Sequence, residues 1–259
     1  MLTTTTTLHT TTRTVYVADG TTDGKIGYYN HTDDSTNVIR KPILIQVEDA
    51  RTLSKSPTTK EEGYQLVDFH TKLPEGRLLN SKSPENKKVI EEVYFDECRR
   101  LVQEVTSAAE AYPYVYRVRN QEQNAKASNK SNFHTDFVLV VHVDRDDVTA
   151  PQRLRALLSA EKAEMLLSKY KSYGSINVWR PVKNVVQKWP LMLVDHKSIE
   201  NWDYSTHMFT LHSSNDERTI LTHDKRYRYI YASDMTPDEA WLFFAFHSDP
   251  ALGIPHGAF

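Results

Sequence analysis

The chain has 259 residues, which is long enough for one large domain with a substantial buried core. Its formal net charge of -2, with 39% hydrophobic and 25% charged residues, is typical of a globular protein and gives no electrostatic reason to expect nucleic acid or an anionic membrane as a partner. The single cysteine, Cys98, excludes an internal disulfide and a cysteine-based metal cluster within one chain. A small molecule is therefore the expected partner.

The first stretch, MLTTTTTLHTTTRT, is rich in threonine and low in complexity. We predict a mobile arm or an edge strand over residues 1–30, followed by a single domain over residues 31–259. The stretch lacks the apolar segment of a signal peptide, and no run in the chain approaches the ~20 apolar residues that span a bilayer. These features predict a cytoplasmic protein that does not enter the membrane.

Two segments have the three-to-four-residue apolar spacing of amphipathic helices. The first covers residues 83–111, with Ser83 as the expected N-cap and Pro84 at the first helical position. The second is predicted from about residue 151 to residue 170. We expect both helices to support the fold rather than to carry chemistry.

Most other segments are rich in aromatic and β-branched residues and are separated by polar turns, which is typical of strands. The predicted strands are two peripheral ones at 42–47 and 63–69, followed by 136–144, 175–180, 190–195, 218–223, 226–232 and 239–247. Many strands with few interleaved helices favour an antiparallel sandwich or barrel with helices packed outside. With 8 glycines and no glycine-rich turn after a strand, a Rossmann sheet is disfavoured.

The run VVHVDRDD places His142 and Asp144 two positions apart in a predicted strand. Residues i and i+2 of a strand point to the same face, so an imidazole and a carboxylate would enter one space. One further histidine would complete the two-histidine, one-carboxylate set of non-haem Fe(II) oxygenases. The three-residue pattern is common by chance and occurs again in HTD at 134–136, so an ordinary strand that ends in a charged turn is the alternative.

Longer motifs occur in a defined order along the chain: EEGYQLVDFHTKL, YPYVYRVRN, HVDRDDVTAPQRLR, SINVWRPVKNVVQKWPLMLVDHKSI and RYRYIYASDMTPDEAWLFFAFHSDPALGIPHGAF. In order and spacing they resemble the fungal hydroxylase/desaturase family, which includes gibberellin desaturase-like and aspergillic-acid-pathway hydroxylase-like enzymes, over most of residues 60–259. The resemblance implies an α+β protein with a double-stranded β-helix core, a cupin-like jelly roll, and flanking helices. It also implies a dioxygenase of secondary metabolism that uses Fe(II) and 2-oxoglutarate to hydroxylate or desaturate a small natural product.

The resemblance assigns three iron ligands. His142 and Asp144 match the first two, and His256 in IPHGAF matches the third. A histidine just beyond the predicted strand 239–247 is well placed to reach a site, because side chains at strand ends and in loops can converge there. His247, at the end of that strand, is the competing third ligand.

The cosubstrate carboxylate needs an anchor, for which an arginine is suited. In NVWRP, Asn177 and Arg180 lie on opposite faces of the predicted strand, so each is a candidate cofactor-binding residue but the two would not share one pocket. Arg117 and Arg119 in YRVRN are further candidates. Family members continue after the PHxAF motif into a strand that carries the usual anchoring arginine, whereas this sequence ends at Phe259.

That departure leaves several explanations open. The sequence could be truncated, or another arginine, from this chain or from a partner subunit, could substitute for the usual anchor. A repurposed oxygenase scaffold could catalyse a cofactor-independent isomerisation, dehydration or cyclisation, with His142, Asp144 or Tyr229 as acid and base. A non-catalytic partner subunit would instead bind no metal and expose an uncovered sheet edge, which a homodimer would cover.

Overall fold

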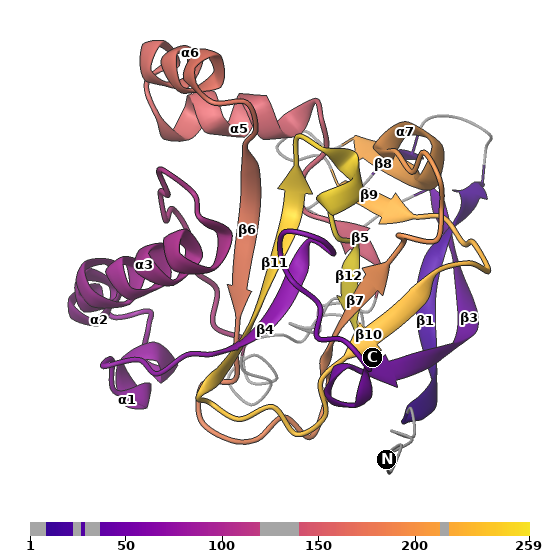
Figure 1. Ribbon diagram of the computed structural model, residues 1–259, viewed down its shortest axis with the longest axis horizontal. Helices are drawn as coiled ribbons and strands as arrows, with labels where there is room; N and C mark the ends of the chain where they lie inside the picture. Colours follow the sequence, from indigo (N-terminus) through magenta and orange to yellow (C-terminus); the bar gives the residue numbers. More distant parts are fainter. Residues whose placement is uncertain (1–8, 23–26, 29–36, 120–139, 213–217) are drawn as a thin grey trace, which may run out of the picture.

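The computed structural model describes residues 9–22, 27–28, 37–119, 140–212 and 218–259, and their strands form two sheets (Figure 1). The nine-stranded sheet contains, in spatial order, β1 (Thr10–Thr21), β3 (Val38–Asp49), β10 (Arg228–Tyr231), β7 (Leu191–Asp195), β12 (His256–Ala258), β5 (His142–Val143), β9 (Arg218–Leu221), β8 (Met208–His212) and β2 (Gly27–Tyr28). The three-stranded sheet contains, in order, β4 (Tyr64–Asp68), β11 (Glu239–His247) and β6 (Gly174–Trp179). The two sheets form the predicted jelly-roll core.

Strand β11 lies at the centre of this arrangement and is buried on both faces, which explains why EAWLFFAFH is apolar without alternation. Trp241 and Phe243 face the nine-stranded sheet, where they share one apolar cluster with residues of its strands β7 and β10. Ala240 and Leu242 point the other way, toward the helices. A shift in pairing register between Phe244 and Phe246 then returns Phe246 to the core between the sheets.

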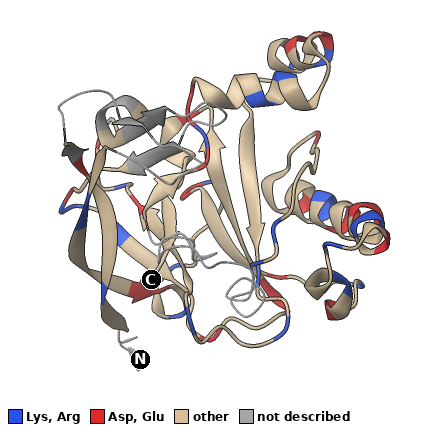
Figure 2. Ribbon diagram, turned by 180° about the vertical axis from the view of Figure 1, so that it is seen from behind, with Lys and Arg blue, Asp and Glu red and all other residues tan. Residues whose placement is uncertain are grey.

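Helices cover the outer face of the three-stranded sheet (Figure 1). They are α1 (Glu75–Leu79), α2 (Pro84–Val89), the π-helical turn η2 (Ile90–Tyr94) and α3 (Phe95–Thr106). The helical layer and the sheet share one buried apolar cluster, which contains Leu242 of β11 with Ile90, Tyr94 and Val102. Figure 2 shows that many of the residues along these helices are charged, whereas the strands consist mostly of uncharged residues.

The predicted helix over 83–111 is confirmed as far as Thr106, with Ser83 as its N-cap, but its last five residues are not helical. Ser107 ends α3 with a left-handed backbone, φ 58°, which stops the helical hydrogen-bond series. The predicted end at residue 111 is therefore wrong.

The single helix predicted over 151–170 is also wrong, because two helices occupy this segment. They are α5 (Thr149–Leu157) and α6 (Ala160–Lys169). Leu158 is extended, and the Ser159 hydroxyl accepts a hydrogen bond from the Lys162 amide as the N-cap of α6. The remaining short helices are α7 (Tyr204–His207), η1 (Ala50–Thr52) and η3 (Pro250–Leu252).

The strand at 42–47 is not peripheral, since it is part of β3, which lies between β1 and β10. At 63–69 the prediction is confirmed, because β4 is an edge strand of the smaller sheet. In the N-terminal region, β1 is an edge strand of the nine-stranded sheet. Residues 1–8 lie outside the described part of the chain. The single domain over 31–259 stays a prediction.

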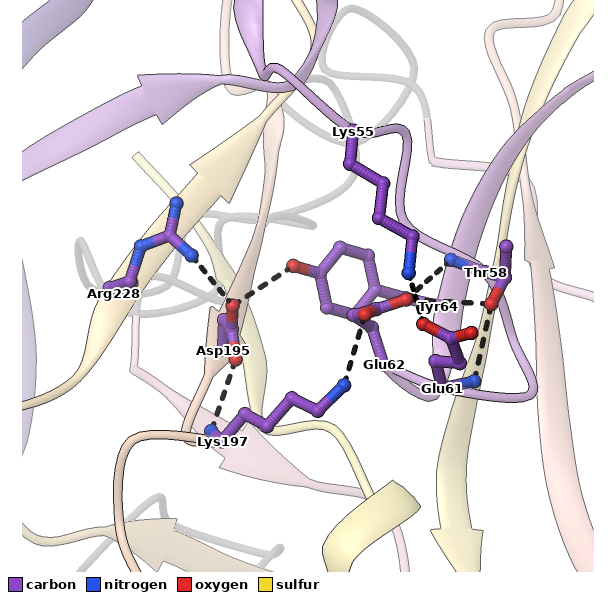
Figure 3. A network of polar contacts seen from close by, with 8 residues as sticks. All are labelled: Lys55, Thr58, Glu61, Glu62, Tyr64, Asp195, Lys197 and Arg228. Atoms are coloured by element: carbon purple, nitrogen blue, oxygen red, sulfur yellow. Dashed lines mark hydrogen bonds and ion pairs between the residues drawn. The ribbon is translucent and has the colours of Figure 1, made fainter.

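A buried carboxylate holds the sheets together on the side of β7. Asp195 accepts hydrogen bonds from the Tyr64 hydroxyl of β4 at 3.4 Å and from the Lys197 amide at 3.0 Å, and it pairs with the Arg228 guanidinium at 3.2 Å (Figure 3). The same guanidinium contacts Glu48 of β3 at 2.6 Å. These contacts connect three strands of the larger sheet with the edge of the smaller one.

We expect Arg228→Ala to lower the free energy of unfolding by about 2 kcal/mol, because it leaves the buried Asp195 charge without its cation. The value is reduced from that of a fully buried pair, since the Arg228 side chain is 46% exposed. Urea denaturation measures the loss. Arg226→Ala is the control, because Arg226 pairs with Asp224 on the surface, and equal losses in the two variants would contradict the assigned role of Asp195.

Candidate metal centre

The two histidines at the centre of the site lie directly opposite each other on neighbouring strands. His256 of β12 pairs with His142 of β5 in the antiparallel register. Side chains of directly opposed residues lie on the same face of a sheet, and here the two ring centroids are 4.5 Å apart. The short strand β12, which the sequence did not predict as a strand, is therefore what brings the end of the chain to His142.

Each imidazole is oriented by a backbone carbonyl. The Nδ1 atom of His142 lies 2.9 Å from the Val140 oxygen, and that of His256 lies 3.1 Å from the Ile254 oxygen. Because a carbonyl oxygen only accepts hydrogen bonds, each Nδ1 carries the proton and donates it. The Nε2 lone pair of each neutral ring is then available to a metal, the arrangement typical of metal-binding histidines.

The Asp144 carboxylate lies between the two Nε2 atoms. Its Oδ1 is 3.6 Å from His142 Nε2, and its Oδ2 is 3.8 Å from His256 Nε2. One ligand atom from each residue fits within 4.8 Å of the others, which is the spacing of a shared ion. Two imidazoles and one carboxylate are a donor set that suits Fe(II) and leaves coordination positions open.

The electrostatics of the three groups favour the forms that bind a cation. Burial lowers the pKa of His256 to about 4, and the neighbouring His142 adds to this effect, so the ring is neutral at ordinary pH. Burial alone would raise the pKa of Asp144, but His256, His142 and the Asn177 amide outweigh it and hold that pKa well below its usual range. The site therefore presents a neutral His256 imidazole and an ionised Asp144 carboxylate.

A large cavity opens onto the three residues. Its volume is about 2120 Å³, well above that of an ordinary small-molecule pocket. It extends between the sheets and the segment that follows α3, with lining residues such as Tyr112, Tyr114, Trp179 and Phe244. A cavity of this size with aromatic walls suits a bulky organic molecule.

The two candidate residues of β6 have different surroundings. The Asn177 amide donates a hydrogen bond of 2.8 Å to Asp144 Oδ2, so it contacts one of the three candidate metal ligands. The Arg180 guanidinium donates instead to the Tyr94 hydroxyl at 3.0 Å and to the Pro237 carbonyl at 2.6 Å, and it lies over the Tyr94 ring. No described contact joins Arg180 to the histidines, so its cofactor-binding role stays a prediction without support from these contacts.

Two further predicted residues lie apart from the group. Tyr229 is 4% exposed in the apolar core between the sheets and is not among the described residues that line the cavity. His247 lines the cavity, but its Nδ1 accepts a hydrogen bond from the Asp249 amide and it is not one of the three grouped ligands. The other His-x-Asp pattern that the sequence analysis named, HTD at 134–136, lies wholly outside the described residues.

Sequence reasoning missed three features of the site: the strand pairing of β12, the carbonyl partners of the histidines, and Phe243. The Phe243 ring packs against His256 with centroids 4.6 Å apart. It lies in an apolar run in which every residue is equally suited to the core, so the pattern carried no signal for this contact. A three-residue strand such as β12 is also too short to show periodicity.

We expect the metal-free protein to lose stability as the pH falls from about 6.5 to about 4, because His256 takes up a proton more readily in the unfolded chain than in the folded one. The contribution is about 3 kcal/mol at most. His256→Phe, which keeps a ring beside Phe243, should flatten this part of the dependence in urea denaturation across that range. An unchanged slope would show that the ring is not buried in its neutral form.

Comparisons with known proteins identify the family. A family model described as an oxidoreductase/YMDC permease-like domain matches residues 15–259. Among the helices that the structure describes, none has the length and apolar character of a membrane span. The chain is 92% identical over its whole length to oxidoreductase clz16 of Cochliobolus lunatus, of which it covers 92%. It is 25% identical to hydroxylase/desaturase efuI of Hormonema carpetanum, over 92% of this chain and 84% of that protein.

A solved structure also matches. It is that of the iron and alpha-ketoglutarate-dependent endoperoxidase NvfI, with a TM-score of 0.78 at 20% identity, over 96% of this chain and 90% of that chain. This likeness concerns the fold and confirms the predicted jelly-roll core with flanking helices. Together with the family model and the near-identical relative, it leads to one conclusion: the chain belongs to the oxidoreductase family that also contains fungal hydroxylase/desaturases.

Proposed function

We propose that this oxidoreductase is a non-haem Fe(II)/2-oxoglutarate-dependent oxygenase that hydroxylates or desaturates a small-molecule secondary metabolite. The observation that carries the proposal is the convergence of His142, Asp144 and His256 on one point at the wall of the cavity. Two relatives support it, since one is named a hydroxylase/desaturase and another a Fe(II)/2-oxoglutarate-dependent dioxygenase.

The residues of this chain have distinct tasks in that reaction. His142 and His256 would hold the iron through Nε2, and Asp144 would hold it through a carboxylate oxygen. When bound, the iron and 2-oxoglutarate supply the oxygen-activating chemistry that attacks an unactivated C–H bond. The buried β11 residues behind the site and the aromatic cavity wall keep bulk water away from the reacting atoms.

We also propose an anchor for the cosubstrate carboxylate. Arg119 lines the cavity. Burial and His142 lower the pKa of His256 most strongly, and the positive charge of Arg119 lowers it further, as expected of a guanidinium in the neighbourhood of the site. A guanidinium near the iron ligands can bind a carboxylate through two parallel hydrogen bonds.

The natural-product nature of the substrate, the cytoplasmic location and the homodimer are parts of the same proposal. A cavity of about 2120 Å³ supports a substrate larger than a common metabolite. Of the three residues that the cofactor-independent alternative would use, Tyr229 lies in the apolar core, away from the cavity that His142 and Asp144 line.

Anaerobic titration of the purified protein with Fe(II) and 2-oxoglutarate tests the function. We expect one Fe(II) per chain and the weak visible charge-transfer band of a chelated 2-oxoglutarate. His142→Ala should abolish Fe(II) binding, because a single histidine and a carboxylate leave too few ligands. Full metal stoichiometry in this variant, or metal binding without the band in the wild type, would contradict the proposal.

Arg119→Ala is expected to weaken 2-oxoglutarate binding by about 10- to 100-fold while leaving Fe(II) binding intact, since a charge-assisted hydrogen-bonded pair contributes about 1.5–3 kcal/mol. The intensity of the charge-transfer band against 2-oxoglutarate concentration measures the Kd. Arg117→Ala is the matched control, because Arg117 lines the same cavity two residues earlier in the chain. Equal effects of the two substitutions would argue against Arg119 as the anchor.

A further inference from the structure

The three candidate ligands differ in what orients them. Each histidine is held by a carbonyl two residues earlier in the chain. Asp144 follows the two-residue strand β5 at a bend, and its side chain, which lines the cavity, is 41% exposed. A carboxylate in that position has several rotamers open to it, and only some of them point at both histidines.

The partner that restricts Asp144 comes from the other sheet. Asn177 lies on β6 of the three-stranded sheet, and its side-chain amide donates to Asp144 Oδ2 over 2.8 Å. An amide N–H can only donate, so this contact leaves Oδ1 and the remaining lone pairs of the carboxylate to a metal. The amide carries no charge, so Asp144 stays an anion with its full attraction for a cation.

A second contact from the same place supports the site. Asn177 pairs directly with Phe243 in the register between β6 and β11. The Phe243 ring packs against His256, so two paired residues of the smaller sheet contact two candidate ligands on the larger sheet. The smaller sheet therefore contacts the candidate metal site through one polar residue, Asn177, and one apolar residue, Phe243.

On this basis we infer that Asn177 is a positioning residue, which holds the Asp144 carboxylate in the orientation that binds the metal. The inference rests on the proposed function, since it concerns the same three ligands. It differs from a role in binding the cosubstrate, because the Asn177 amide is already engaged by Asp144. Partners that orient ligands in this way typically change metal affinity by about 10- to 100-fold when they are removed.

The test is a Co(II) titration of the metal-free, full-length protein, followed by its visible absorption. Asn177→Leu keeps nearly the same shape without the donor, and Asn177→Ala is a second variant in case leucine prevents folding. Ser175→Ala is the matched control, because Ser175 lies on the same face of β6, two residues earlier, and its hydroxyl contacts Tyr114 instead of a ligand. Thermal unfolding of each metal-free variant shows whether the fold is intact.

We expect both Asn177 variants to bind Co(II) with a Kd about 10- to 100-fold higher than the wild type and with an altered absorption spectrum. The Ser175 variant should keep the wild-type Kd and spectrum. A purely structural role for Asn177 would lower the unfolding temperature but leave the spectrum of bound Co(II) unchanged, and that result would overturn the inference. Wild-type protein that binds no Co(II) would overturn the proposed function itself, so the two failures are distinguishable.

Discussion

The pairing register between β5 and β12 is the constraint on which the candidate site depends. It places His142 and His256 opposite each other, so that both rings leave the same face of the sheet. A slip of one residue would turn His256 to the other face and separate the ligands, because side chains alternate along a strand. The register is fixed from both sides, since β12 also pairs with β7, where His256 lies opposite Leu193.

The remaining structure serves to support that pairing. The apolar residues of β11 fill the space behind the histidines, and β6 supplies the amide that contacts Asp144. The helices bury the opposite face of β6 and β11, so the smaller sheet is packed on both sides. On the far side of β7, the contacts of Asp195 with Tyr64 and Arg228 connect the same two sheets. The site is thus built where two sheets meet and both are well packed.

Much of the framework could be predicted from the sequence, because long periodic segments carry their own signal. The start of the helix after the N-cap Ser83 was predicted correctly, and so were the strands near 175–180, 190–195 and 239–247, with close bounds. Short elements were not predicted. Leu158 ends one helix and Ser159 caps the start of the next within a continuous apolar pattern, and β12 has only three residues. Their positions depend on capping and on tertiary pairing, which local periodicity does not encode.

The site was predictable in its residues but not in its supporting contacts. His142 and Asp144 follow from alternation along a strand, and His256 follows from the resemblance to the family. The role of Asn177 depends on how closely β6 approaches Asp144, which follows β5 in the other sheet. The motif NVWRP does not indicate which residue the Asn177 side chain contacts. Arg180 looked equivalent in sequence, yet it contacts Tyr94 in the helical layer.

The most direct test of the central claim is anomalous diffraction from crystals soaked with Co(II). The account predicts a single strong peak at about 2 Å from His142 Nε2, His256 Nε2 and one carboxylate oxygen of Asp144. A peak elsewhere, or a His256 ring turned away from the other two ligands with no peak between them, would contradict it.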